Sequence, residues 1–202
     1  MQWDGLSGET KELRGIKLPQ QKKLDYGLIH KGTNIPLGVE VKNARGWVYA
    51  NSDTAWELLG KCAYLEALPI IITRQISYTA FRDFKKIGIL GLTTYKQFFH
   101  PDLQDDPDLK LIKSKDGLCF KDITFTTDPS PDLIKFFSIT IPNEIERSYK
   151  IFMDNLFLIR TYAIEKDMWN PNMPSQKRQA LYGEFKAKLF GWSEDKPPYE
   201  IV

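Results

Sequence analysis

The chain has 202 residues, of which 42% are hydrophobic and 27% are charged, and its formal net charge is +2. This length is enough for one substantial core, and the composition is that of a soluble globular protein. No apolar run approaches the roughly 18 residues of a membrane-spanning helix, and the net charge is too small to indicate nucleic-acid binding by itself.

The N-terminal segment MQWDGLSGETKELRG lacks the basic start and the apolar stretch of a secretion signal, so we expect a cytoplasmic protein. Cys62 and Cys119 are far apart and lack metal-ligand spacing, which predicts two reduced core thiols. Residues 1–50 carry more Lys and Arg than Asp and Glu, whereas residues 101–132 show the reverse. If the partner is DNA, we expect the first half of the chain to face it.

Residues 24–30 and 37–42 are predicted to be strands joined by the turn-rich segment KGTNIP, and residues 47–49 a short third strand. A helix is predicted over 54–67, with Thr54 and Glu57 as a capping box and Pro69 as its stop. A buried strand over 70–74, a helix over 77–88 and a strand over 89–93 follow. This alternation predicts an α/β fold with a central mixed β-sheet flanked by helices.

In the second half, residues 109–126 suggest a β-hairpin that turns at Asp116 and Gly117. A long helix is predicted over 143–168 and a shorter one over 175–191, since each segment has apolar residues at helical spacing. We therefore predict a core at residues 1–100 and a C-terminal elaboration at 101–202, a hairpin plus two helices packed on the same domain.

Three polar residues of the first two predicted strands share one sheet face. Side chains alternate across a strand, and a hairpin centred on the predicted loop pairs Tyr26 with Val41 and Asp25 with Lys42. Asp25, Glu40 and Lys42 then lie on one face and the aliphatic residues on the other. A register shift of one residue would bury the Asp25 charge among valines without a partner, at a cost of several kcal/mol.

Two carboxylates and an ammonium on one sheet face suit the hydrolysis of a phosphodiester. A pair of acids supplies hard oxygen ligands for Mg²⁺. A lysine beside them can orient or help to deprotonate a metal-bound water, and it offsets the charge that develops on phosphorus.

This stretch resembles the PD-(D/E)XK nuclease superfamily, in which an acid on one strand and a (D/E)-x-K triplet on its hairpin partner precede a helix and another strand. Asp25 matches the acid, Glu40, Val41 and Lys42 match the triplet, and the resemblance covers about residues 7 to 95. It implies a restriction endonuclease-like core of order αβββαβ. It also implies a DNA endonuclease of the restriction or repair type that uses Mg²⁺, or Mn²⁺ in its place.

In such an enzyme Asp25, Glu40 and the Val41 carbonyl would hold the metal, and Lys42 would position the attacking water. The resemblance further implies an acid from an N-terminal helix, for which Glu9 and Glu12 are the candidates. Enzymes of this kind commonly act as homodimers, with the helix over 144–167 as the candidate contact. The predicted nucleic-acid contacts are Asn43, Arg45 and Lys61.

The triplet alone is a weak signal, because the chain contains six of them. Only the triplet at Glu40 lies on an apolar strand that is paired with another strand carrying an acid in phase. The pattern also departs from the superfamily, with Leu24 in place of proline and Gly60 where some branches have glutamine. No phosphate-binding loop is present, so we expect no nucleotide cofactor.

Two alternatives stay open. The chain can be a catalytically inactive nuclease-fold module that binds nucleic acid or a protein partner. It can also be a structural subunit in which the three residues form a surface salt bridge worth about 0 to 1 kcal/mol, with Lys61 as an ordinary solvent-facing residue and Asn43 and Arg45 as a polar strand end.

Overall fold

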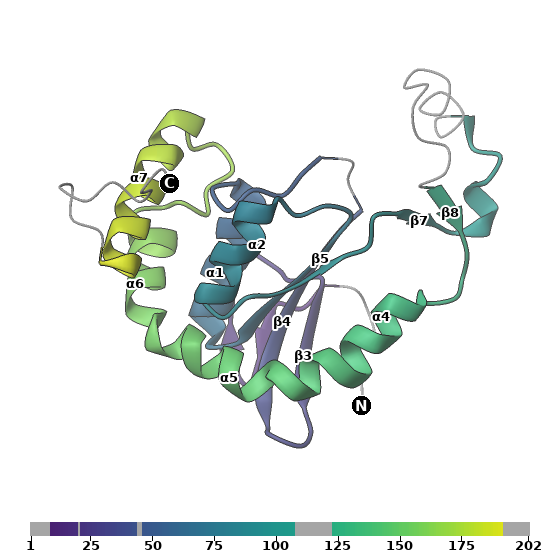
Figure 1. Ribbon diagram of the computed structural model, residues 1–202, viewed down its shortest axis with the longest axis horizontal. Coiled ribbons are helices and arrows are strands. Elements are labelled where there is room, and N and C mark those ends of the chain that lie inside the picture. Colours follow the sequence, from purple (N-terminus) through teal and green to yellow (C-terminus); the bar gives the residue numbers. More distant parts are fainter. Residues whose placement is uncertain (1–8, 20, 44–45, 108–122, 192–202) are drawn as a thin grey trace, which may run out of the picture.

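The structure is a computed structural model that describes residues 9–19, 21–43, 46–107 and 123–191 (Figure 1). Its centre is a four-stranded sheet in the order β3-β4-β5-β6. β3 (Tyr26–His30) and β4 (Ile35–Lys42) form an antiparallel hairpin, and β4, β5 (Leu68–Thr73) and β6 (Leu90–Thr93) run parallel. α1 (Asp53–Leu65) connects β4 to β5, and α2 (Tyr78–Lys86) connects β5 to β6. The predicted α/β class with a mixed, helix-flanked sheet is confirmed.

The hairpin register differs from the predicted one by two residues. Tyr26 pairs with Val39 instead of Val41, because β4 already begins at Ile35 and the loop closes at Asn34 in the left-handed conformation, with φ 56°. A shift of two residues keeps every side chain on its face. The predicted register is therefore wrong. The predicted division between the faces holds for Leu28, Leu37 and Val39. It is wrong for Leu24, which packs with Cys62 in the core on the α1 side.

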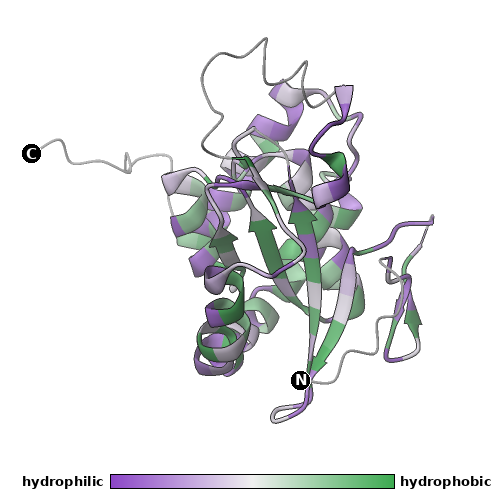
Figure 2. Ribbon diagram, turned by 90° about the vertical axis from the view of Figure 1, so that its right-hand side faces the viewer, coloured by the Kyte–Doolittle hydropathy of each residue, from purple (hydrophilic) through white to green (hydrophobic). Residues whose placement is uncertain are grey.

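Each sheet face is covered by helices. One face packs Leu37, Val39 and Ile70 against a continuous helical segment made of α4 (Pro131–Lys135), a π-helical turn η3 (Phe136–Thr140) and α5 (Ile141–Asp154). The opposite face packs Ile71 against α1 and α2. Figure 2 shows the hydrophobic strands between helices that carry hydrophilic residues.

A second layer of helices packs on α1. It consists of α6 (Leu156–Arg160), a second π-helical turn η4 (Thr161–Glu165) and α7 (Ser175–Phe190). Trp56 of α1 is fully buried and lies edge-on to Phe185 of α7, with ring centroids 5.0 Å apart. Burial of each such side chain contributes on the order of 1.5–3 kcal/mol, so this layer fixes the position of α1.

The long helical segment starts at Pro131, twelve residues before the predicted start at Asn143. Ser130 caps it by accepting a hydrogen bond from the Leu133 N–H, and Pro131 occupies the first turn, where its missing N–H costs nothing. The π-helical turn ends at Thr140, two residues before Pro142, and a proline interrupts the regular hydrogen-bond ladder of a helix.

The N-terminal segment is a β-hairpin from residue 12 to residue 17, not the expected helix. β1 (Glu12–Leu13) pairs with β2 (Ile16–Lys17), and the turn residues Arg14 and Gly15 have φ of 53° and 79°. Two successive left-handed residues define the hairpin turn that an Arg-Gly pair permits. The order αβββαβ is therefore not reproduced in the described part of the chain.

Of two further strand predictions, the structure corrects one, and the turn of the other lies in a segment that it does not describe. Instead of a strand over 47–49, Val48 makes an isolated parallel bridge to Ile76. β7 (Gln97–Phe99) precedes a 3₁₀ turn η1 (Pro101–Leu103) and pairs in parallel with β8 (Ile123–Phe125) at one side of the molecule (Figure 1). The predicted turn at Asp116 and Gly117 lies outside the described residues.

Among the helices of the described segments, none is long and apolar enough to cross a membrane.

Gly88 is expected to tolerate no side chain. It has φ 82°, and an added Cβ would lie 2.3 Å from the Ser148 carbonyl oxygen and 2.7 Å from the Phe152 nitrogen, both in the backbone of α5. Gly88→Ala should lower the unfolding free energy by about 2–5 kcal/mol in urea denaturation. The matched control is Gly183→Ala in α7, where an added Cβ meets nothing within 4 Å and should raise stability by about 0.5–1 kcal/mol. Equal effects of the two substitutions would contradict this packing.

Candidate functional site

Glu40 lies at the centre of a buried ion-pair network on the α1 side of the sheet. Only 4% of the residue is exposed. Its Oε1 lies 2.6 Å from the Lys42 Nζ, and its Oε2 lies 3.3 Å from the Lys61 Nζ. Both oxygens of this carboxylate therefore have a cationic partner, one at the strand end and one inside the protein.

Asp25 is held against the backbone of β4. It directly precedes β3, and its Oδ2 accepts a hydrogen bond of 2.6 Å from the Val41 N–H. In an extended strand the N–H and C=O of one residue point to the same edge, so the Val41 carbonyl faces the edge at which Asp25 lies. The structure thus brings Asp25, Glu40, Val41 and Lys42 together at the end of β4.

The groups around Lys42 raise the pKa of its ammonium. Partial burial lowers the pKa of its ammonium, but the hydrogen bond and charge of Glu40, together with the charges of Asp25 and Glu57, outweigh burial, and the pKa is raised. Lys42 is therefore protonated at neutral pH. In this state it donates hydrogen bonds and positive charge, and it does not accept a proton.

α1 contributes two charged residues to the network. The Lys61 Nζ lies 3.3 Å from the Glu57 Oε1 as well as 3.3 Å from Glu40, and the Lys22 Nζ lies 3.6 Å from the same Glu57 oxygen. Acids and lysines thus alternate from Lys42 through Glu40, Lys61 and Glu57 to Lys22. Lys61 is only 3% exposed and is not a solvent-facing residue of the helix surface.

Close packing of α1 on β4 creates this contact. A Cβ on Gly38 would lie 2.5 Å from the Cys62 Sγ, so only glycine lets the helix approach this closely. The helix is capped by Ser52, whose side chain accepts from the Ala55 N–H, and not by the predicted pair of Thr54 and Glu57. Glu57 is thereby free to pair with lysines. Glu57 was not among the predicted site residues, although its i,i+4 spacing to Lys61 was a usable signal.

The remaining predicted site residues lie elsewhere or make other contacts. Glu9 forms an ion pair with Lys23, and Glu12 pairs with Lys17 at 3.8 Å within the N-terminal hairpin. The Asn43 side chain donates to the Phe98 carbonyl at 2.7 Å and accepts from the Phe98 N–H at 3.2 Å, so it ties the end of β4 to β7. Arg45 lies outside the described residues.

A groove passes the end of β4 beside the ion-pair network. Its polar part has a volume of about 360 Å³ and is lined by Lys42, Thr73, Thr94 and Lys96 among others. Its apolar part of about 300 Å³ runs along the other sheet face. Val41 lines both parts and Lys42 lines the polar part, whereas Asp25 and Glu40 line neither. The polar part carries the acid Asp128 as well as the two lysines.

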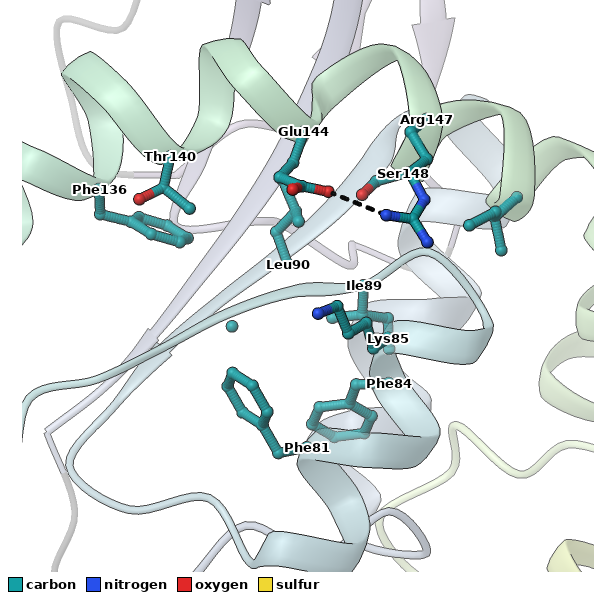
Figure 3. A pocket seen from close by; sticks show the side chains of 12 residues that line it. Phe81, Phe84, Lys85, Ile89, Leu90, Phe136, Thr140, Glu144, Arg147 and Ser148 are labelled. Atoms are coloured by element: carbon teal, nitrogen blue, oxygen red, sulfur yellow. Dashed lines mark ion pairs between the residues drawn. The ribbon is translucent and has the colours of Figure 1, made fainter.

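A separate hollow of about 180 Å³ lies between α2, β6 and α5 (Figure 3). Phe81 and Phe84 of α2 form its apolar wall, and Glu144 and Arg147 of α5 face each other at 3.9 Å on the other side. It contains no pair of carboxylates with lysines comparable to that at Glu40. Its lining gives no basis for hydrolytic chemistry.

The donors at the end of β4 fit a hard divalent cation. Asp25 and Glu40 offer carboxylate oxygens and Val41 a carbonyl oxygen, which are the ligand types of Mg²⁺, and water completes its octahedral shell. Lys42 is partly exposed, with 36% of its side chain accessible, so it can move from the Glu40 Oε1 when a cation binds. Within the described segments, no three or more His, Cys, Asp and Glu side chains are grouped as a metal cage.

No protein-family model, curated protein or solved structure matches this chain. The resemblance to PD-(D/E)XK nucleases therefore rests on the sequence pattern alone.

The raised pKa of Lys42 makes its contribution to stability dependent on pH. The contribution is fully present below the ordinary lysine pKa of 10.5 and is lost as the pH rises through the higher folded-state value. The unfolding free energy of the parent minus that of Lys42→Met should be about 0 to 1 kcal/mol at neutral pH, because the pair is partly exposed. This difference should shrink above pH 10.5 in urea denaturation at several pH values. A difference that grows with pH would contradict a stabilising ion pair between Lys42 and Glu40.

Proposed function

We propose that the protein is a Mg²⁺-dependent endonuclease that hydrolyses DNA phosphodiester bonds, of the restriction or repair type. The observation that carries this proposal is the meeting of Asp25, Glu40 and Lys42 at the end of β4. The carboxylate of Asp25 is held at the Val41 N–H, and the ammonium of Lys42 touches Glu40, beside a groove open to solvent.

Asp25, Glu40 and the Val41 carbonyl would hold the cation, with Mn²⁺ as a substitute for Mg²⁺. When bound, the cation polarises the phosphoryl oxygens and lowers the pKa of a bound water. The protonated Lys42 would donate a hydrogen bond to the attacking water and offset the negative charge that develops on phosphorus. The water would add in line and lose a proton to solvent, the bond from phosphorus to the leaving oxygen would break, and that oxygen would take up a proton from solvent.

The groove gives the nucleic acid a path to these residues. Lys96, Thr127 and Ser130 line its polar part together with Lys42, and the acid Asp128 lies in the same lining. Ammonium and hydroxyl groups are common partners of the phosphate backbone, and they position a strand without reading its sequence. We therefore expect the scissile phosphate to enter along the groove. Cleavage of both strands would use a homodimer, for which the helical segment of α5 and α6 is the candidate contact.

A second candidate function is a catalytically inactive nuclease-fold module that binds nucleic acid or a protein partner. The observation in its favour is that both Glu40 oxygens are already paired with lysines, Lys42 at 2.6 Å and Lys61 at 3.3 Å. A carboxylate with two ammonium partners can serve as a closed structural ion pair.

Nicking of supercoiled plasmid DNA separates the two functions. The endonuclease should convert supercoiled plasmid to open circles and linear DNA with Mg²⁺ or Mn²⁺ and should stop when EDTA is added. Binding of DNA without cleavage under all metal conditions would support the inactive module. Neither binding nor cleavage would leave the ion-pair network with a structural role only.

A further inference from the structure

Lys61 is a buried cation that the proposed reaction does not use. Its side chain is 4% exposed, and its Nζ lies 3.3 Å from a Glu40 oxygen of β4 and 3.3 Å from a Glu57 oxygen of α1. An ammonium between two carboxylates of different elements neutralises charge on both, as a bridging cation would. This arrangement bears on how many metal ions the site can hold.

We infer that the catalytic site holds a single divalent cation, and that Lys61 takes the place on the inner side of Glu40 where a second cation would bind. The inference rests on the proposed function, since it concerns the metal of that same site. It makes Lys61 a positioning residue, which acts through Glu40 and does not touch the substrate.

The geometry of Glu40 supports one ion. In two-metal sites the ions lie about 3.5–4 Å apart and share a carboxylate that bridges them. Here the inner oxygen, Oε2, faces Lys61, and only Oε1 faces the strand end where Asp25 and the partly exposed Lys42 lie. A cation can therefore replace Lys42 on the outer oxygen, but the inner oxygen already has a fixed partner.

The charge balance supports the same conclusion. The network contains three lysines, Lys22, Lys42 and Lys61, and with Asp25 it contains three carboxylates, so its formal charge is zero. One divalent cation raises it to +2, which a phosphodiester and a hydroxide neutralise. A second would raise it to +4 next to an ammonium that is 3% exposed, where like charges repel strongly because water is excluded.

Lys61 is also unable to leave its place easily. Removing one partner of a buried ion pair costs about 3–5 kcal/mol, because the other charge stays buried without compensation. Lys42, with 36% of its side chain exposed, can instead move from the Glu40 Oε1 toward the groove, where the proposed reaction uses its ammonium. The two lysines of Glu40 thus differ in mobility, and only the outer one exchanges with a metal ion.

The test is the stoichiometry of Mn²⁺ binding by isothermal titration calorimetry, with no DNA present. The parent should bind one Mn²⁺ per chain at this site, Lys61→Arg should also bind one, and Lys61→Ala should bind two. The matched control is Lys22→Met, which removes the lysine at the far end of the network, 3.6 Å from Glu57, and should still bind one.

Two bound ions in the parent, or a single ion in a folded Lys61→Ala variant, would overturn the inference. If Lys61→Ala does not fold, the number of Mn²⁺ ions bound by the parent tests the inference: one ion supports it and two overturn it. These outcomes differ from a failure of the proposed function, in which the parent binds no Mn²⁺ and does not cleave plasmid DNA in any metal.

Discussion

Glu40→Gln is expected to reduce metal-dependent plasmid cleavage by about 10²–10⁴-fold, the range typical for loss of a positioned catalytic group. The substitution removes the negative charge of a proposed metal ligand and keeps the shape of the side chain. Because Glu40 is 4% exposed and contacts two lysines, no neighbouring acid can take over its position. Initial rates of nicking, with Mg²⁺ varied over a wide range, measure the loss.

The matched control for this variant is Glu184→Gln. Glu184, Phe185 and Lys186 form another (D/E)-x-K triplet, but they lie on α7, where Glu184 pairs with Lys166 at 2.6 Å. Its cleavage rate should equal that of the parent. If the Glu40→Gln variant folds, as checked by circular dichroism, and cleaves at the parent rate, Glu40 takes no part in catalysis.

Lys61→Met is expected to lower the unfolding free energy by about 3–5 kcal/mol, because it leaves the buried Glu40 carboxylate without its inner cation. The methionine has nearly the same length and no charge, so the loss reports the ion pair and not a cavity. Urea denaturation of the parent and the variant at neutral pH measures the difference.

A double-mutant cycle tests whether this loss belongs to the contact with Glu40. Adding Glu40→Gln to Lys61→Met removes the uncompensated charge, and the double variant should recover most of the lost stability. Glu57 keeps Lys22 as a partner in both variants. Additive losses from the two single substitutions would show that Glu40 and Lys61 do not interact in the folded protein.

The alternation of side chains was enough to predict the shared face of Glu40 and Lys42, because a shift by one residue would bury charges among valines. It was not enough to predict the register. The register depends on where the loop closes, and Asn34 closes it in a left-handed conformation that the segment KGTNIP does not make obvious. The error of two residues did not affect the shared facing of Glu40 and Lys42.

The position of Lys61 could not be read from the sequence. A lysine on an amphipathic helix is ordinarily solvent-facing. Lys61 is buried because α1 packs closely on Gly38 of β4, a contact between segments that are far apart in the sequence. The N-terminal hairpin was missed for a local reason. The Arg14-Gly15 pair between Leu13 and Ile16 is a hairpin turn signal, but the charged segment around it has a helical composition.

The most direct measurement of the central claim is the anomalous diffraction of crystals soaked in Mn²⁺. The proposed function predicts an anomalous peak at coordination distance, about 2.0–2.6 Å for hard cations, from carboxylate oxygens of both Asp25 and Glu40. A peak at another position, or crystals that bind Mn²⁺ nowhere near the end of β4, would contradict the assignment of this site.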